Sequence, residues 1–133
     1  MPARKSKIPH RNQSPTGWWI YREVEQWVSR KQKKLTPRSR CLVWENTRII
    51  RAKDRAAAFA KAMRLGRTEH PSKTNGGEWR FVGISMLLPI YDDLEEGAEL
   101  LWDVHKSVPV SKIKRMAKTP KQLPVFDDTD PDS

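Results

Sequence analysis

Residues 43–66 decide the fold, and they read Val-Trp-Glu-Asn-Thr-Arg-Ile-Ile-Arg-Ala-Lys-Asp-Arg-Ala-Ala-Ala-Phe-Ala-Lys-Ala-Met-Arg-Leu-Gly. The first part mixes β-branched, aromatic and polar residues, which is typical of a strand. Asp54 stands where a helix N-cap belongs, because its carboxylate can accept hydrogen bonds from the first free amides. The alanine-rich run that follows contains strong helix formers, and Gly66 tolerates the left-handed backbone that often ends a helix. This stretch predicts a strand, a capped turn and a helix from Arg55 to Leu65.

The helix is expected to bury one apolar face, formed at i, i+3, i+4 and i+7 by Ala56, Phe59, Ala60 and Met63. The preceding strand, residues 41–52, has apolar and polar residues on both faces. That mixture favours a position near the middle of a sheet, with partial cover on each side.

Three further segments have strand patterns. Residues 17–28 are rich in aromatic and β-branched types, with Glu23 and Glu25 at period two on one face. Residues 78–91 are apolar on both faces and predict a central strand, whereas residues 99–106 alternate and predict a fourth strand with one wetter face. The order strand, strand, helix, strand, strand predicts an α+β fold: an antiparallel sheet of about four strands with one helix packed on one face.

The length of 133 residues fits one domain with tails. We expect a disordered basic arm at 1–16, an α+β domain at 17–108 and a poorly ordered extension at 109–133 that ends in an acidic tail. Within the extension, Lys112 to Lys118 can form one or two helical turns. The arm is either a solvated tail or a polyanion-binding segment.

The net charge of +10 is concentrated at the front of the chain. Residues 1–40 carry eleven Lys and Arg against two Glu, whereas residues 41–108 carry ten basic and ten acidic residues. Residues 29–40 contain six basic residues and no acid, which predicts an exposed loop with weak affinity for polyanions. The candidate polyanion-binding residues are Arg30, Lys31, Lys33, Lys34, Arg38 and Arg40.

Six tryptophans allow two interpretations. Aromatic and basic residues interleave between Trp18 and Trp27, and an aromatic sheet face with a basic rim is how single-stranded nucleic acids are commonly held. Tryptophans at strand spacing also form cores. The pattern leaves both interpretations open.

Motifs for catalysis, metal ions and cofactors are absent from the sequence, so no catalytic residue, metal or cofactor is expected. His10, His70 and His105 are expected at the surface. The single cysteine, Cys41, is expected to be a buried thiol; it excludes an intrachain disulfide and favours a reducing compartment, the cytoplasm. No apolar run approaches the ~20 residues that span a bilayer, so no membrane association is expected.

Two carboxylates are candidates for an ion pair or for an acid/base role. Glu45 and Glu99 fall on predicted strands, where each can pair with an arginine across the sheet. The alternative is an acid/base pair in a pocket.

Several short motifs resemble those of a small bacterial family known as domain of unknown function 4288. The most specific are Trp44-Glu45, Phe81-Val82-Gly83 and Gly97-Ala98-Glu99-Leu100, and the resemblance extends over about Trp18 to Val104. It implies a short bacterial protein with an initial tryptophan-containing strand. It implies no activity, cofactor or catalytic residue.

One helix cannot cover both faces of the predicted sheet, so a second subunit, the C-terminal segment or a ligand must cover the other. We favour a homodimer packed sheet on sheet. The sequence therefore predicts a non-enzymatic, self-associating binding domain. The alternatives are a nucleic-acid-associated protein that uses the arm and the 29–40 loop, and an enzyme.

Overall fold

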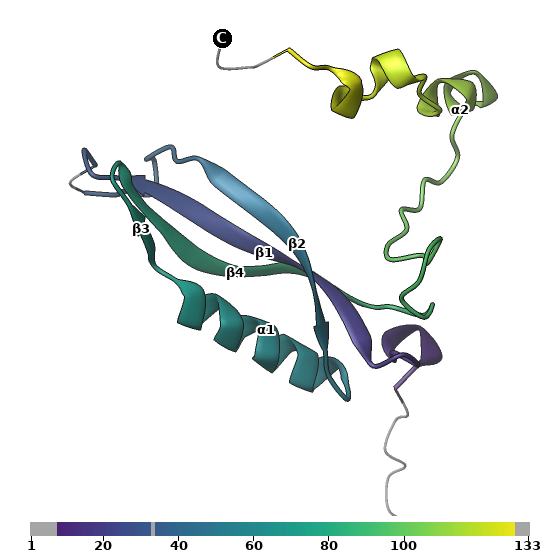
Figure 1. Cartoon of the computed structure of the whole chain (residues 1–133), viewed down its shortest axis with the longest axis horizontal. Helices are drawn as coiled ribbons and strands as arrows, with labels where there is room; N and C mark the ends of the chain where they lie inside the picture. Colours follow the sequence, from purple (N-terminus) through teal and green to yellow (C-terminus); the bar gives the residue numbers. More distant parts are fainter. Residues whose placement is uncertain (1–7, 33, 130–133) are drawn as a thin grey trace, which may run out of the picture. The chain divides into compact units, whose positions relative to one another are not determined.

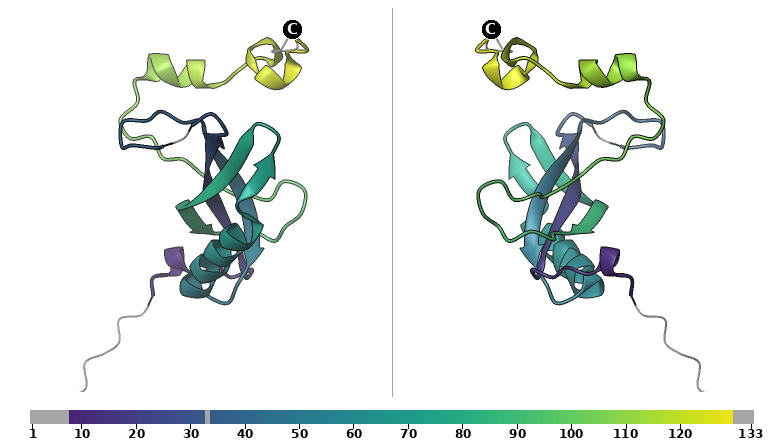
Figure 2. Two further views of the ribbon diagram at one scale, coloured as in Figure 1. Left: turned by 90° about the vertical axis from the view of Figure 1, so that its left-hand side faces the viewer. Right: turned by 90° about the vertical axis from the view of Figure 1, so that its right-hand side faces the viewer.

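The computed structural model describes residues 8–32 and 34–129, which belong to two units, residues 1–102 and 103–133. The first unit is a four-stranded antiparallel sheet in the order β2-β1-β4-β3, with a helix, α1, along one face (Figures 1 and 2). The strands are β1 (Trp18–Ser29), β2 (Val43–Arg51), β3 (Ser72–Thr74) and β4 (Gly77–Pro89), and α1 spans Arg55–Glu69. The predicted α+β class and the antiparallel sheet of four strands are confirmed.

Two strand predictions are wrong. Residues 99–106 contain no strand, and the fourth strand is instead β3, a three-residue strand in the segment expected to be a polar loop. The strand at 41–52 was expected near the middle of the sheet, but β2 is an edge strand whose one partner among the described strands is β1. The apolar residues on both faces of this segment suggested cover on both sides, but many of them are exposed in the structure.

The helix starts as predicted. Asp54 caps it, since its Oδ1 accepts a hydrogen bond from the Ala57 amide at 2.8 Å. The predicted end is wrong, because α1 continues through Gly66 to Glu69.

The predicted apolar face of α1 is also wrong. Its buried residues are the small ones, Ala58, Ala62 and Gly66, whereas Phe59 is half exposed. Small residues at this spacing let the helix lie close to the sheet, and a Cβ atom on Gly66 would overlap the Phe81 ring. Close approach, rather than apolar bulk, selects the buried face.

The core lies between α1 and the sheet. It consists of Trp19, Tyr21, Ile50, Ala58 and Ala62. The Trp19 indole also donates a hydrogen bond to the Ala52 carbonyl at 3.1 Å, so its one polar atom is satisfied.

β4 is longer than the part of β1 it pairs with. Glu23 pairs with Ile84 and Glu25 with Phe81, which leaves Val82 and Ser85 without partners in β1. Such bulges bend a strand and increase its twist, and they are common beside functional sites.

The ends of the chain are described only in part. Residues 1–7 and 130–133 lie outside the described residues. Residues 8–16 include a 3₁₀ turn, η1 (His10–Asn12), and hydrogen bonds from Ser14 to the Trp18 carbonyl at 2.6 Å and from Thr16 to the Ile90 carbonyl at 2.7 Å. These contacts tie residues 14–16 to the sheet.

The second unit contains α2 (Val110–Met116) and two 3₁₀ turns, η2 (Pro120–Gln122) and η3 (Pro124–Phe126). The helical turns expected near residues 112–118 are therefore confirmed. Among the described residues, no helix has both the length and the apolar character to cross a membrane.

Candidate functional site

A cluster of ionisable side chains lies on the helix-facing side of β1. Successive residues of a strand point to opposite faces, so Tyr21, Glu23 and Glu25 share the face that carries the core. Glu23 is 0% exposed and Glu25 is 8% exposed. Carboxylates are rarely buried this deeply without a partner, so their surroundings identify what the cluster can do.

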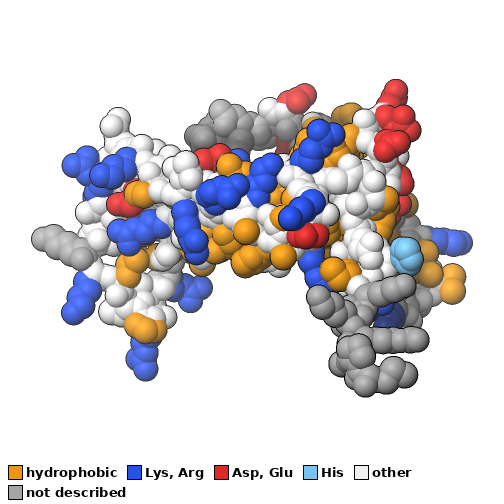
Figure 3. All heavy atoms as spheres, turned by 90° about the horizontal axis from the view of Figure 1, so that it is seen from below, with side chains coloured by type: hydrophobic (Ala, Val, Ile, Leu, Met, Phe, Trp, Pro, Cys, Tyr) orange, Lys and Arg blue, Asp and Glu red, His pale blue; other side chains and the backbone are white. Residues whose placement is uncertain are grey.

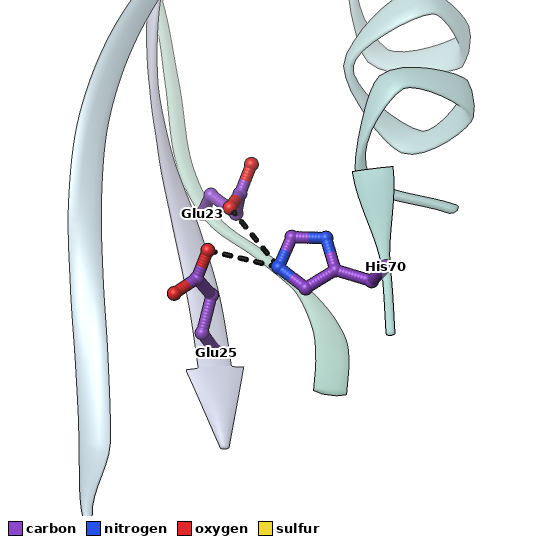
Figure 4. A group of neighbouring side chains, drawn as sticks. All are labelled: Glu23, Glu25 and His70. Carbon is purple, nitrogen blue, oxygen red and sulfur yellow. Dashed lines mark hydrogen bonds and ion pairs between the residues drawn. The ribbon is translucent and has the colours of Figure 1, made fainter. Parts of the chain in front are cut away.

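His70 brings an imidazole to these carboxylates from the end of α1 (Figure 4). Its Nδ1 lies 2.7 Å from the Gly66 carbonyl oxygen, and its Nε2 lies 2.8 Å from Glu25 Oε1 and 3.8 Å from Glu23 Oε1. The side chain is only 5% exposed, which corrects the expectation that every histidine lies at the surface.

The Gly66 carbonyl fixes the tautomer of His70. A carbonyl oxygen only accepts, so Nδ1 carries a proton and donates it to Gly66. In the neutral imidazole, Nε2 then presents its lone pair to Glu25. That contact is attractive only when a proton or a cation lies between Nε2 and the carboxylate oxygen.

Glu23 has no hydrogen-bond donor for either carboxylate oxygen among the described residues. Its nearest cation besides His70 is Arg48 of β2, whose Nε lies 3.4 Å from Glu23 Oε2. Arg48 is shared, because its Nη1 lies 3.3 Å from Glu69 Oε2. One guanidinium therefore faces carboxylates from both β1 and α1.

The pKa values of Glu23 and Glu25 are shifted in opposite directions. Burial raises the pKa of Glu23, and the adjacent Glu25 raises it further, against the opposing effect of Arg48. Burial also acts to raise the pKa of Glu25, but Glu23 and His70 beside it outweigh burial and lower that pKa. The pair therefore favours a protonated Glu23 next to an ionised Glu25. Burial likewise raises the pKa of Tyr21.

A shallow groove of about 410 Å³ reaches the other side of His70. Its lining includes Met63 and Phe81, with Arg67, Glu78 and Arg80 as charged residues. The groove brings solvent to the imidazole, although the carboxylates themselves stay closed to a substrate.

The predicted carboxylates occupy a different place. Glu45 is exposed on β2 and accepts a hydrogen bond from the Ser85 hydroxyl at 2.8 Å. Glu99 is exposed, and its amide donates to Asp92. Among the described residues no contact joins Glu45 to Glu99.

Sequence reasoning misses the Glu23–Glu25–His70 cluster. The period-two spacing of Glu23 and Glu25 shows that they share a face, but not that the face is buried. His70 lies 45 residues from Glu25 in the chain, and the predicted end of the helix at Leu65 places His70 in a loop. A helix continued by one turn would have placed the imidazole over β1.

The predicted polyanion-binding residues lie in the connection between β1 and β2. Lys33 is outside the described residues, and the other five are exposed: Arg30, Lys31, Lys34, Arg38 and Arg40. Arg30 also donates to the Asn75 carbonyl at 3.1 Å. In Figure 3 several Lys and Arg side chains gather at this end of the molecule.

The aromatic residues do not form one exposed platform. Trp19 and Tyr21 are buried in the core. Trp44 and Trp79 stack with their ring centroids 4.6 Å apart, and Trp27 lies 5.2 Å from Trp79. Cys41 is half-buried and lies 3.4 Å from the Gln26 side-chain amide.

These features define a small α+β domain with a closed polar centre and a basic connection at one end of its sheet. Residues 18–102 match the family described as domain of unknown function DUF4288, and the chain belongs to that family. The resemblance predicted from the sequence is thereby confirmed. Comparison with curated proteins and with solved structures finds no match.

Proposed function

We propose that this chain is a non-enzymatic binding domain that associates with a second copy of itself through β2. The observation that carries the proposal is the free edge of this strand. β2 has nine residues, and within the described part of the chain it pairs with β1 alone. Three consecutive apolar residues, Leu42 just before the strand and Val43 and Trp44 at its start, are 55%, 51% and 52% exposed.

A second copy of the chain is the binding partner that the β2 edge favours most. Unpaired edge strands template pairing with another strand, and an identical β2 can approach antiparallel about a two-fold axis. The same apolar residues would then be buried in both subunits. The burial of Glu23 and Glu25, which keeps a substrate from these carboxylates, favours binding rather than catalysis.

Light scattering tests the self-association. We expect a mass near twice the 15.5 kDa of the chain. Changing Leu42 and Val43 to Lys should return the mass to that of the monomer, because charged side chains block edge pairing. Phe59→Lys, at a half-exposed site on α1, is the matched control and should leave the dimer intact. A monomeric mass for the unchanged chain contradicts the proposal.

Nucleic-acid binding is a second candidate, favoured by the exposed Lys and Arg of the β1–β2 connection. Such residues release counterions when they neutralise phosphates, so affinity for a single-stranded oligonucleotide should fall steeply with salt. Replacing Lys31, Lys34, Arg38 and Arg40 by Ser should reduce the slope of log K against log salt by about 0.7 for each phosphate that is no longer neutralised.

The control for this experiment has the same change in net charge. It replaces four basic residues of the second unit by Ser: Lys112, Lys114, Arg115 and Lys118. An equal decrease in affinity for both variants would show that total charge, rather than the connection, carries the affinity.

A further inference from the structure

We propose that Glu23, Glu25 and His70 form a binding site for one divalent transition-metal ion of the Zn²⁺ type. The ligands are one imidazole nitrogen and one oxygen from each carboxylate, with water at the remaining position. This site is independent of the self-association proposed above.

The donor atoms have the required proximity. One ligand atom from each residue lies within 4.8 Å of the others. Two ligands of a tetrahedral ion with bonds of ~2.0 Å lie about 3.3 Å apart. The distances from His70 Nε2 to Glu25 Oε1 and Glu23 Oε1, 2.8 Å and 3.8 Å, fall on either side of that value. Shifts of about half an ångström would therefore bring each carboxylate oxygen to that separation from Nε2.

His70 is oriented as a ligand. Metal-binding histidines usually donate the other ring N–H to a carbonyl or a carboxylate, which fixes the ring and its tautomer. The bond from Nδ1 to the Gly66 carbonyl at 2.7 Å does this and leaves the Nε2 lone pair directed at the carboxylates (Figure 4).

Glu23 supplies the second, independent observation. It is fully buried, it faces the cluster, and neither of its oxygens has a hydrogen-bond donor among the described residues. A buried carboxylate without such partners is costly. A proton between Glu25 and His70 would satisfy that contact but would leave Glu23 as it is, whereas a cation bound by all three satisfies both carboxylates.

The surrounding charges favour a divalent ion. The cluster and its rim hold three carboxylates, Glu23, Glu25 and Glu69. Among the described residues Arg48 is the one guanidinium that contacts any of them, through its ion pairs with Glu23 and Glu69. A metal ion binds the ionised carboxylates and the neutral imidazole, and in that form the group carries a net charge of −2, which a divalent cation cancels. Tyr21 and Asn46 are the other polar neighbours, and the groove beside His70 gives an ion an approach from solvent.

Calorimetric titration of the full chain with ZnCl₂ tests the site. The parent carries Cys41→Ser, His10→Ala and His105→Ala, which remove the other thiol and imidazole ligands. We expect one equivalent of Zn²⁺ to bind. Glu23→Gln and Glu25→Gln should each weaken binding at least tenfold, because losses of ~10–100-fold are typical even for residues that only support a ligand. Glu45→Gln and Glu99→Gln are the exposed, matched controls and should bind as the parent does.

The melting temperature of the same parent, with and without Zn²⁺, also tests the site if a glutamine variant fails to fold. An ion that binds only the folded chain raises Tm, so saturating Zn²⁺ should raise the Tm of the parent. The proposal is overturned by a parent that binds no zinc or gains no stability from it. Folded Glu23→Gln and Glu25→Gln variants that bind as tightly as the parent also overturn it.

Discussion

Burial opposes the ionisation of Glu23, and this makes the stability of the ion-free domain depend on pH. The raised pKa means that the fold favours the protonated carboxyl. Its contribution to stability is complete below the ordinary pKa of 4.5 and is lost as pH rises through the raised value. Glu25 acts in the opposite sense, because its lowered pKa gives stability above 4.5 that is lost as pH falls through the lowered value.

Glu23→Gln therefore changes the pH profile of stability in a defined direction. In the presence of a chelator, the free energy of unfolding of the unchanged chain should fall as the pH rises from 4.5 through the raised pKa of Glu23. The variant has no carboxyl to ionise and should lack this fall. Urea denaturation across that pH range measures it, and parallel profiles for the two proteins would contradict the environment assigned to Glu23.

At the scale of single residues, the sequence predicts Asp54 correctly because capping depends on a local hydrogen bond. It cannot predict the partners of Glu23. Their meeting with His70 depends on where α1 ends and on the bulges of β4, both of which are set by tertiary packing. Glu45 and Glu99, which the sequence favours, are exposed for the same reason: strand parity identifies a face but not what covers it.

Among the elements, α1 is placed by its small residues. Gly66→Ala should destabilise the domain by about 1–3 kcal/mol, because the new methyl group would overlap Phe81 in a packed interior. Helix propensity alone predicts the opposite, a gain of about 1 kcal/mol.

Ala60→Gly is the control for propensity, since Ala60 is an exposed position of the same helix. It should lose about 1 kcal/mol through propensity alone. Chemical denaturation of both variants separates the two effects. A Gly66→Ala variant more stable than the unchanged chain would show that the helix does not depend on close approach to Phe81.

The central position of β4 follows from its hydrophobic pattern, but the existence of β3 and the edge position of β2 do not. Apolar residues on both faces of residues 41–52 suggest cover on both sides, whereas the structure leaves Leu42, Val43 and Trp44 about half exposed. Pairing partners, which the pattern of one strand does not contain, determine which strand is an edge. That exposed edge is the basis of the proposed dimer.

For the whole molecule, the excess positive charge lies outside most of the folded domain. The surplus of basic residues lies before residue 41, and the described part of the β1–β2 connection exposes five of them. The buried charged residues of the domain are instead acidic, Glu23 and Glu25. Salt should therefore weaken any polyanion binding far more than it weakens an ion held in the buried cluster.

X-ray absorption at the zinc edge, on the full chain loaded with one equivalent of Zn²⁺, tests the central claim of a buried carboxylate–histidine metal site most directly. The proposal predicts a shell of nitrogen and oxygen ligands at ~2.0–2.2 Å, with the outer-shell scattering of one imidazole that disappears in His70→Ala. A sulfur shell at ~2.3 Å, which Cys41 could supply, or an imidazole signal that survives His70→Ala, would contradict it.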